Sequence, residues 1–128
     1  MTDVLIVDDS PVVRKVARRI LEDMNVKTSE ATDGNQALAA CSLVMPQAIL
    51  VDGNMPDLNG FEFVKRLRRM PRGDQAKVVF WLCEINVSQI ARATHAGANE
   101  IMFKPFDEDL LRSRFEWICS SLSPATTR

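Results

Sequence analysis

Carboxylates and one lysine stand at the ends of three apolar runs, and these residues are the best suited to chemistry in the chain. Asp8 and Asp9 follow the first run, Asp52 ends the third and Lys104 follows the last. Such runs read as buried strands of a parallel sheet. Parallel strands end at one edge, where open α/β folds place their sites. We therefore expect the three carboxylates and the ammonium group to lie close together.

The chemistry that this group of residues favours is phosphoryl transfer to a carboxylate. Clustered carboxylates repel one another unless a cation is bound, and oxygen ligands completed by water suit Mg²⁺. A fixed ammonium group suits an incoming phosphoryl group. Attack by a carboxylate on phosphorus would give an acyl phosphate. The alternative for Asp52 taken alone is that it ends its strand for turn chemistry only.

The elements that must position these residues alternate five times between strand and helix. We predict strands over residues 4–7, 26–30, 48–52, 78–82 and 100–103. We predict helices over residues 11–23, 60–70 and 87–95. Another helix should begin at 33–34 and stop at 45–46, and the last should begin at 107–108. This alternation predicts an α/β fold, a doubly wound parallel sheet covered by helices on both faces. We expect one domain over residues 1–122 and a flexible tail over 123–128.

Apolar faces and cysteines give more detailed expectations about burial. The first helix should bury one face, made of Val12, Val13, Val16, Ala17, Ile20 and Leu21. Cys41, Cys83 and Cys119 are widely spaced and each lies in an apolar segment, so we predict three buried, reduced thiols.

Composition excludes several classes of function. The chain has 128 residues and a net charge of −1, which gives no general attraction to nucleic acid or to an acidic membrane. Asp3, Asp8 and Asp9 interrupt the first apolar stretch, so we expect no signal peptide. No apolar run approaches the ~20 residues of a membrane span. We predict a cytoplasmic protein without membrane association.

The chain resembles the receiver domain of the two-component response regulators, of the stand-alone, CheY-like kind. The resemblance rests on VLIVDDS (4–10), VDGNMPDLNG (51–60) and GANEIMFKPF (97–106), and it extends to about residue 122. It implies a flavodoxin-like, five-stranded sheet of order 2-1-3-4-5 with five helices. The three motifs occur in the expected order at the expected strand ends.

The resemblance also implies a role for each site residue. Asp52 would be the phosphoacceptor, and Lys104 would contact the phosphoryl group. Asp8, Asp9, Asp52 and the backbone carbonyl of Asn54 would hold Mg²⁺. The donor would be a histidine kinase or a histidine phosphotransferase, and the chain would act in signalling rather than as an enzyme, beyond self-phosphorylation and autodephosphorylation.

The switch positions of the family are atypical in this chain. Receivers usually carry Thr or Ser at the end of the fourth strand, where counting back from Lys104 gives Leu82, with Cys83 as its neighbour. An aromatic residue is usual three positions before the lysine, where this chain has Ile101. Without a hydroxyl group, one hydrogen bond to a charged group is lost, which is worth roughly 1.5–3 kcal/mol.

Two modes of action therefore stay open. The first is a single-domain response regulator that is phosphorylated on Asp52 and contacts a downstream protein through its helix 4–strand 5–helix 5 face, without a DNA-binding domain. The second is a phosphorylation-independent receiver that binds a partner protein or an anionic nucleotide. The basic side chains of Arg66, Arg68 and Arg69 are the predicted binding residues for that second mode, unless they form only a solvated face.

Overall fold

The sheet has five parallel strands in the order β2-β1-β3-β4-β5, as expected. The computed structural model describes residues 3–55, 58–83, 85–103 and 108–122, and of residues 117–122 it describes the backbone only. The strands are β1 (Asp3–Val7), β2 (Lys27–Ala31), β3 (Ala48–Asp52), β4 (Lys77–Leu82) and β5 (Glu100–Phe103). The helices are α1 (Pro11–Asp23), α2 (Gly34–Leu43), α3 (Gly60–Leu67), α4 (Val87–Ala96) and α5 (Glu108–Leu122).

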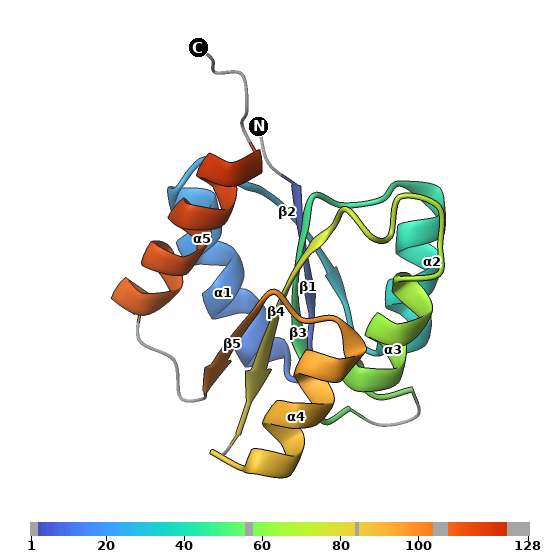
Figure 1. Cartoon of the computed structure of the whole chain (residues 1–128). Helices are drawn as coiled ribbons and strands as arrows, with labels where there is room; N and C mark the ends of the chain where they lie inside the picture. The colour runs from blue at the N-terminus through green and yellow to red at the C-terminus, as the bar shows by residue number, and fades with distance from the viewer. Residues whose placement is uncertain (1–2, 56–57, 84, 104–107, 123–128) are drawn as a thin grey trace.

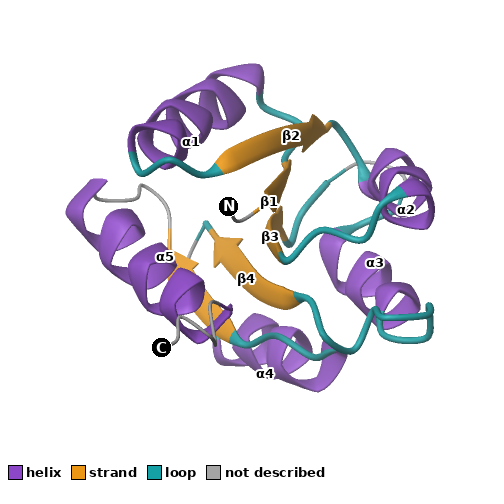
Figure 2. Cartoon of the chain, turned by 90° about the horizontal axis from the view of Figure 1, so that it is seen from above, coloured by secondary structure: helices purple, strands orange, loops and turns teal. Residues whose placement is uncertain are grey.

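Helices cover both faces of the sheet, with α1 and α5 on one face and α2, α3 and α4 on the other (Figures 1 and 2). Side chains alternate along each strand, so one strand serves both cores. In β3, Ile49 and Val51 join the core beneath α2, α3 and α4. Leu50 joins the core beneath α1 and α5. The inner strands β1, β3 and β4 are buried on both faces, whereas the edge strands β2 and β5 are partly exposed.

Side chains at the helix ends explain where the helices begin. Ser10, Asp33 and Asn59 are the N-caps of α1, α2 and α3, and each accepts a hydrogen bond from a backbone N–H three residues later. Pro11 occupies the first turn of α1, where its missing N–H costs no hydrogen bond. Gly97 ends α4 with φ of 118°, a backbone conformation that glycine adopts without strain. The three N-caps lie in the loops at the carboxyl edge of the sheet, whereas Gly97 lies at the opposite edge, before β5.

Two expectations about burial are wrong. Val12 is 69% exposed and Val16 is 42% exposed, because only the part of α1 around Ala17, Ile20 and Leu21 faces the sheet and α5. Cys41 is buried, but Cys83 is exposed, because it follows the last residue of β4 and lies beyond the core. Cys119 lies among the residues of which the structure describes the backbone only.

Candidate functional site

Three carboxylates meet at the carboxyl edge of the sheet. Asp8 and Asp9 directly follow β1, and Asp52 is the last residue of β3, the neighbouring strand. One ligand oxygen from each residue lies within 4.8 Å of the other two. Asp8 and Asp52 are buried, whereas Asp9 is exposed. The cluster therefore has an inner pair of acids and an outer acid in contact with solvent.

The turn after β1 positions the first acid of the cluster. The backbone N–H of Asp8 donates to the carbonyl oxygen of Ala31 in β2 at 3.2 Å, which extends the β1–β2 ladder by one bond. Its carboxylate Oδ1 accepts a hydrogen bond from the backbone N–H of Ser10 at 2.9 Å. Ser10 is also the N-cap of α1, so the cap and the acid are fixed by one short turn.

The second acid is positioned by β3 and by the loop that follows it. Asp52 lies opposite Trp81 in the β3–β4 ladder, and both residues are almost fully buried. The backbone N–H of Asn54 donates to Asp52 Oδ1 at 3.1 Å, which turns the carboxylate toward the loop. Gly60 packs directly against the carbonyl of Asp52, where a Cβ atom would overlap the oxygen. The start of α3 is therefore in close van der Waals contact with the backbone of Asp52.

The expectation that Lys104 joins the cluster falls outside the described residues. The β4–β5 ladder is described as far as the pair Leu82 and Phe103, and Phe103 immediately precedes Lys104 in the sequence. Lys104 and the carbonyl ligand expected from Asn54 stay predictions.

The donor set of this cluster fits a hard divalent cation. All of its ligand atoms are carboxylate oxygens, which Mg²⁺ and Ca²⁺ prefer, and no cysteine or histidine belongs to it. The exposed position of Asp9 leaves one side of the cluster open to water, as Mg²⁺ requires. The geometry thus passes the simplest test of the predicted cation site.

Leu82, one of the predicted switch residues, packs beside Gly53, the residue that follows Asp52. Leu82 is fully buried, and its Cδ2 lies 2.8 Å from the point that a Cβ atom on Gly53 would occupy. Phe61 packs at the same point and stacks on Phe80 with ring centroids 5.2 Å apart. Ile101 is partly buried against the same core. The residue predicted for the family's hydroxyl position, Leu82, is therefore a buried hydrocarbon side chain.

The three arginines proposed as a binding surface do not share one environment. Arg66 pairs with Glu62 at 3.5 Å, and Arg69 is exposed. Arg68 instead turns inward. It directly follows α3, which ends at Leu67 rather than at the predicted Met70. Its guanidinium donates to four oxygens, the carbonyls of Gly73, Ala76 and Gly97 and the side chain of Asn99, at 2.6–3.0 Å.

These contacts give Arg68 a structural role that differs from the expected one. Burial lowers the pKa of Arg68, and the charge of Asp74 opposes that shift. The guanidinium stays charged in any case, because the ordinary pKa of arginine is so high. Arg68 joins the end of α3, the start of β4 and the α4–β5 turn, so its donors are not available to a ligand.

A basic hollow that the sequence did not reveal lies between α3 and α4. It has a volume of about 370 Å³ and is lined by Phe61, Lys65, Ser88, Ala91, Arg92 and His95. The guanidinium carbon of Arg92 lies 4.1 Å from the centroid of the Phe61 ring, which is a cation–π contact. The only signal in the sequence was the helical spacing of Ser88, Arg92 and His95, which cannot tell which neighbouring helix they face.

Comparison with known proteins places the chain in a family. Residues 4–116 match the family model of the response regulator receiver domain, so the chain belongs to this family. It resembles the CheY response regulators of two-component signalling, a family of signalling domains. The chemotaxis protein CheY of Pseudomonas aeruginosa is 31% identical over 90% of this chain and 94% of its own length. CheY-3 of Vibrio cholerae is 30% identical over 93% and 92%.

Solved structures agree with this placement. CheY4 of Vibrio cholerae superposes with a TM-score of 0.87 at 30% identity, over 92% of this chain and 98% of that one. The receiver domain of a histidine kinase from Syntrophus aciditrophicus gives 0.89 at 25% identity, over 97% and 94%. Other relatives are larger: the chain spans 52% of the response regulator MprA and 9% of the sensor protein EvgS. Within the described residues, no helix is both long and apolar enough to cross a membrane.

Proposed function

We propose that the chain is a response regulator that accepts a phosphoryl group on Asp52 from a histidine kinase or a histidine phosphotransferase. The observation that carries the proposal is the convergence of Asp8, Asp9 and Asp52 within 4.8 Å at the carboxyl edge of the sheet. Asp8 and Asp9, with the carbonyl of Asn54, would hold Mg²⁺, and Lys104 would contact the transferred group. The phosphorylated protein would then act by contact with a downstream protein.

The transfer requires one bond to form and one to break. A carboxylate oxygen of Asp52 attacks phosphorus, and the phosphorus–nitrogen bond of the donor phosphohistidine breaks, so that the bonding pair leaves with the imidazole. The hydrogen bond from the backbone N–H of Asn54 to Oδ1 fixes the orientation of the attacking carboxylate. Bound Mg²⁺ would supply positive charge to the phosphoryl oxygens. Burial of Asp8 and Asp52 strengthens such charge interactions, because little water competes with them.

Intact-mass analysis after incubation with Mg²⁺ and a small phosphodonor tests this proposal. Acetyl phosphate and phosphoramidate should each add one phosphoryl group to the wild-type chain, and chelation of Mg²⁺ should prevent the addition. Asp52→Asn should stay unlabelled, whereas Asp23→Asn, which removes an exposed carboxylate of α1, should label as the wild type does. Labelling that survives in Asp52→Asn would contradict the assignment of the phosphoacceptor.

A second candidate function is supported by the basic hollow and by Leu82. Lys65, Arg92 and His95 bring three basic side chains to one hollow, and within the described residues none of them has a carboxylate partner. The buried Leu82 offers no hydroxyl group to a phosphoryl oxygen. These features favour a receiver that binds an anionic ligand through α3 and α4, with or without phosphorylation.

Calorimetric titration with pyrophosphate tests the second candidate. The wild-type chain should bind it saturably, and the double variant Lys65→Gln with Arg92→Gln should lose the binding. Arg66→Gln is the matched control, because Arg66 neighbours Lys65 on α3 but does not line the hollow. Equal losses in the control and in the double variant would show that only general surface charge matters.

The downstream contact through α4, β5 and α5 remains a prediction, and so does a cytoplasmic location.

A further inference from the structure

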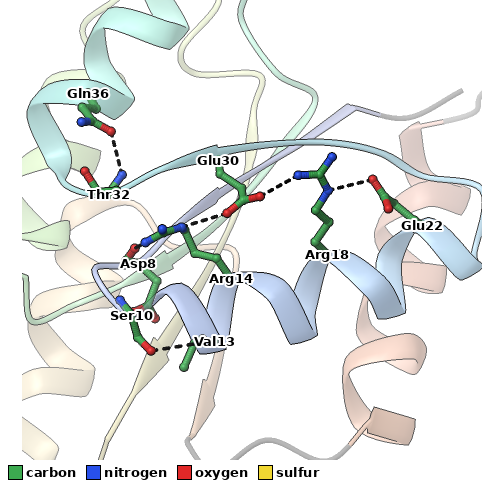
Figure 3. A network of polar contacts seen from close by, with 9 residues as sticks. All are labelled: Asp8, Ser10, Val13, Arg14, Arg18, Glu22, Glu30, Thr32 and Gln36. Carbon is green, nitrogen blue, oxygen red and sulfur yellow. Dashed lines mark hydrogen bonds and ion pairs between the residues drawn. The ribbon is translucent and has the colours of Figure 1, made fainter.

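The carbonyl group of Asp8 receives its hydrogen bond from a side chain of α1. Asp8 is fully buried, and a buried carbonyl oxygen needs a donor. Arg14 provides it: its terminal NH1 group donates to the Asp8 oxygen at 2.7 Å (Figure 3). The Arg14 side chain is only 14% exposed, against 49% for Arg18 one turn later. Arg14 is therefore packed into the turn that carries the acids, whereas Arg18 is at the surface.

The direction of the Arg14 side chain is set by β2. Its Nε donates to Glu30 Oε1 at 2.9 Å, and the other oxygen of Glu30 accepts from Arg18 NH1 at 2.8 Å (Figure 3). Burial opposes ionisation of Glu30, but the hydrogen bonds from both arginines outweigh it and hold the pKa of Glu30 below its ordinary value. Glu30 is thus a charged anchor near neutral pH, and it holds the planar guanidinium in one orientation.

The peptide group that Arg14 contacts is the one that joins Asp8 to Asp9. Within the described residues, the carboxylate of Asp9 is exposed and has no hydrogen bond or ion pair of its own. Its direction therefore depends on the backbone that carries it. A rotation of the Asp8–Asp9 peptide would move the outer acid away from the inner pair, and the contact with Arg14 opposes that rotation.

We propose that Arg14 is a positioning residue for the divalent-cation site, because its guanidinium holds the Asp8–Asp9 peptide in the orientation that brings Asp9 to Asp8 and Asp52. The inference rests on the proposed function, since it concerns the same cation. It assigns to Arg14 a role that its charge alone would not predict. A cation near the site repels Mg²⁺, so removal of the charge alone would strengthen Mg²⁺ binding, whereas loss of the orientation weakens it.

Calorimetric titration of the full chain with Mg²⁺ separates these effects. Arg14→Met removes both the charge and the hydrogen bonds, and Arg14→Lys keeps the charge but loses the planar fork that serves Asp8 and Glu30 together. Arg14→Lys should bind Mg²⁺ about 10-fold more weakly, as is typical when the group that orients a ligand is lost. Arg14→Met should also bind it more weakly, but by less, because loss of the positive charge favours the cation. Arg18→Met is the matched control, because Arg18 shares Glu30 but does not contact Asp8, and its affinity should stay within about twofold.

The outcomes distinguish this inference from the proposed function. If the wild-type chain shows no saturable Mg²⁺ binding, the proposed function is contradicted and the inference falls with it. If the wild-type chain binds Mg²⁺ and a folded Arg14→Met binds it equally or more tightly, the inference alone is wrong. Circular dichroism establishes folding, and if Arg14→Met does not fold, Arg14→Lys decides by the same criterion.

Discussion

The start of α3 presses on the backbone of Asp52, and replacing Gly60 by alanine tests whether that contact sets the geometry of the site. The added Cβ atom would overlap the carbonyl oxygen of Asp52. Relief of the overlap requires a displacement on the order of 1 Å, because non-bonded atoms settle at about 3.5 Å. Either the first turn of α3 or the backbone of Asp52 must shift, and a shift of Asp52 moves the nucleophile relative to Asp8 and Asp9.

The effect on stability should be moderate. Overpacking of this kind costs about 2–3 kcal/mol, and the more restricted unfolded chain of the alanine variant offsets about 0.5–1 kcal/mol. The free energy of unfolding should therefore fall by about 1–2.5 kcal/mol, which lowers the melting temperature by about 4–9 °C in a domain of this size. The variant should remain folded at 25 °C.

The effect on labelling should be much larger than the effect on stability. A misplacement of about 1 Å at a reacting group can lower a rate about 100-fold, and we expect that loss in the rate of labelling by acetyl phosphate at 25 °C. Gly73→Ala is the matched control, because its Cβ atom would overlap the carbonyl oxygen of Leu67 at the far end of α3. It should lose similar stability but label within about twofold of the wild type.

Two results would refute this reasoning. One is a Gly60→Ala variant that labels as fast as the wild type while its melting temperature falls as expected. The other is a Gly73→Ala variant that loses labelling in the same proportion as Gly60→Ala. Either result would mean that the contact between α3 and Asp52 does not control the geometry of the nucleophile.

Further predictions concern Arg68 and the cysteines. Arg68→Met should lower the free energy of unfolding by about 3 kcal/mol in denaturant titrations, because it leaves buried carbonyls without a donor. Arg66 is exposed, so Arg66→Met should change the free energy of unfolding by less than about 0.5 kcal/mol. Equal losses in the two variants would refute this distinction. Iodoacetamide at pH 8 should modify exposed Cys83 and spare Cys41, and the reverse pattern would contradict the burial pattern. Burial raises the pKa of Cys41 to about 11, so the folded state holds this proton more tightly and stability should fall between about pH 9 and 11; Cys41→Ala should lack that part of the slope.

The residue pattern predicted a parallel sheet and the convergence of the acids, and the resemblance to receiver domains implied the strand order. The apolar runs of β1 and β3 are short, continuous and followed by Asp8 and Asp52, so both their type and their ends are visible from residue pattern alone. The predicted starts of α1 and α3 are confirmed, and Ser10 and Asn59 cap them through hydrogen bonds to backbone N–H groups only three residues away. Signals within a few residues of one another were therefore reliable.

The errors arose at residues whose burial or side-chain contacts depend on segments distant in the sequence. Arg68 appeared as one member of a basic run, but its side chain donates to carbonyls as far along the chain as Gly97. Val12 belongs to the apolar stripe of α1 by spacing, yet the sheet and α5 cover only part of that stripe. The contact of Arg14 with the Asp8 carbonyl has no sequence signature, because an arginine on the first helix also suits a solvated face.

The most direct test of the central claim is to locate the phosphoryl group. After labelling with acetyl phosphate and Mg²⁺, borohydride reduction converts an aspartyl phosphate to homoserine, which tandem mass spectrometry assigns to one position. The convergence of the acids predicts homoserine at position 52, with none when Mg²⁺ is chelated. Homoserine at position 8 or 9 with Asp52 intact would contradict the assignment of the nucleophile.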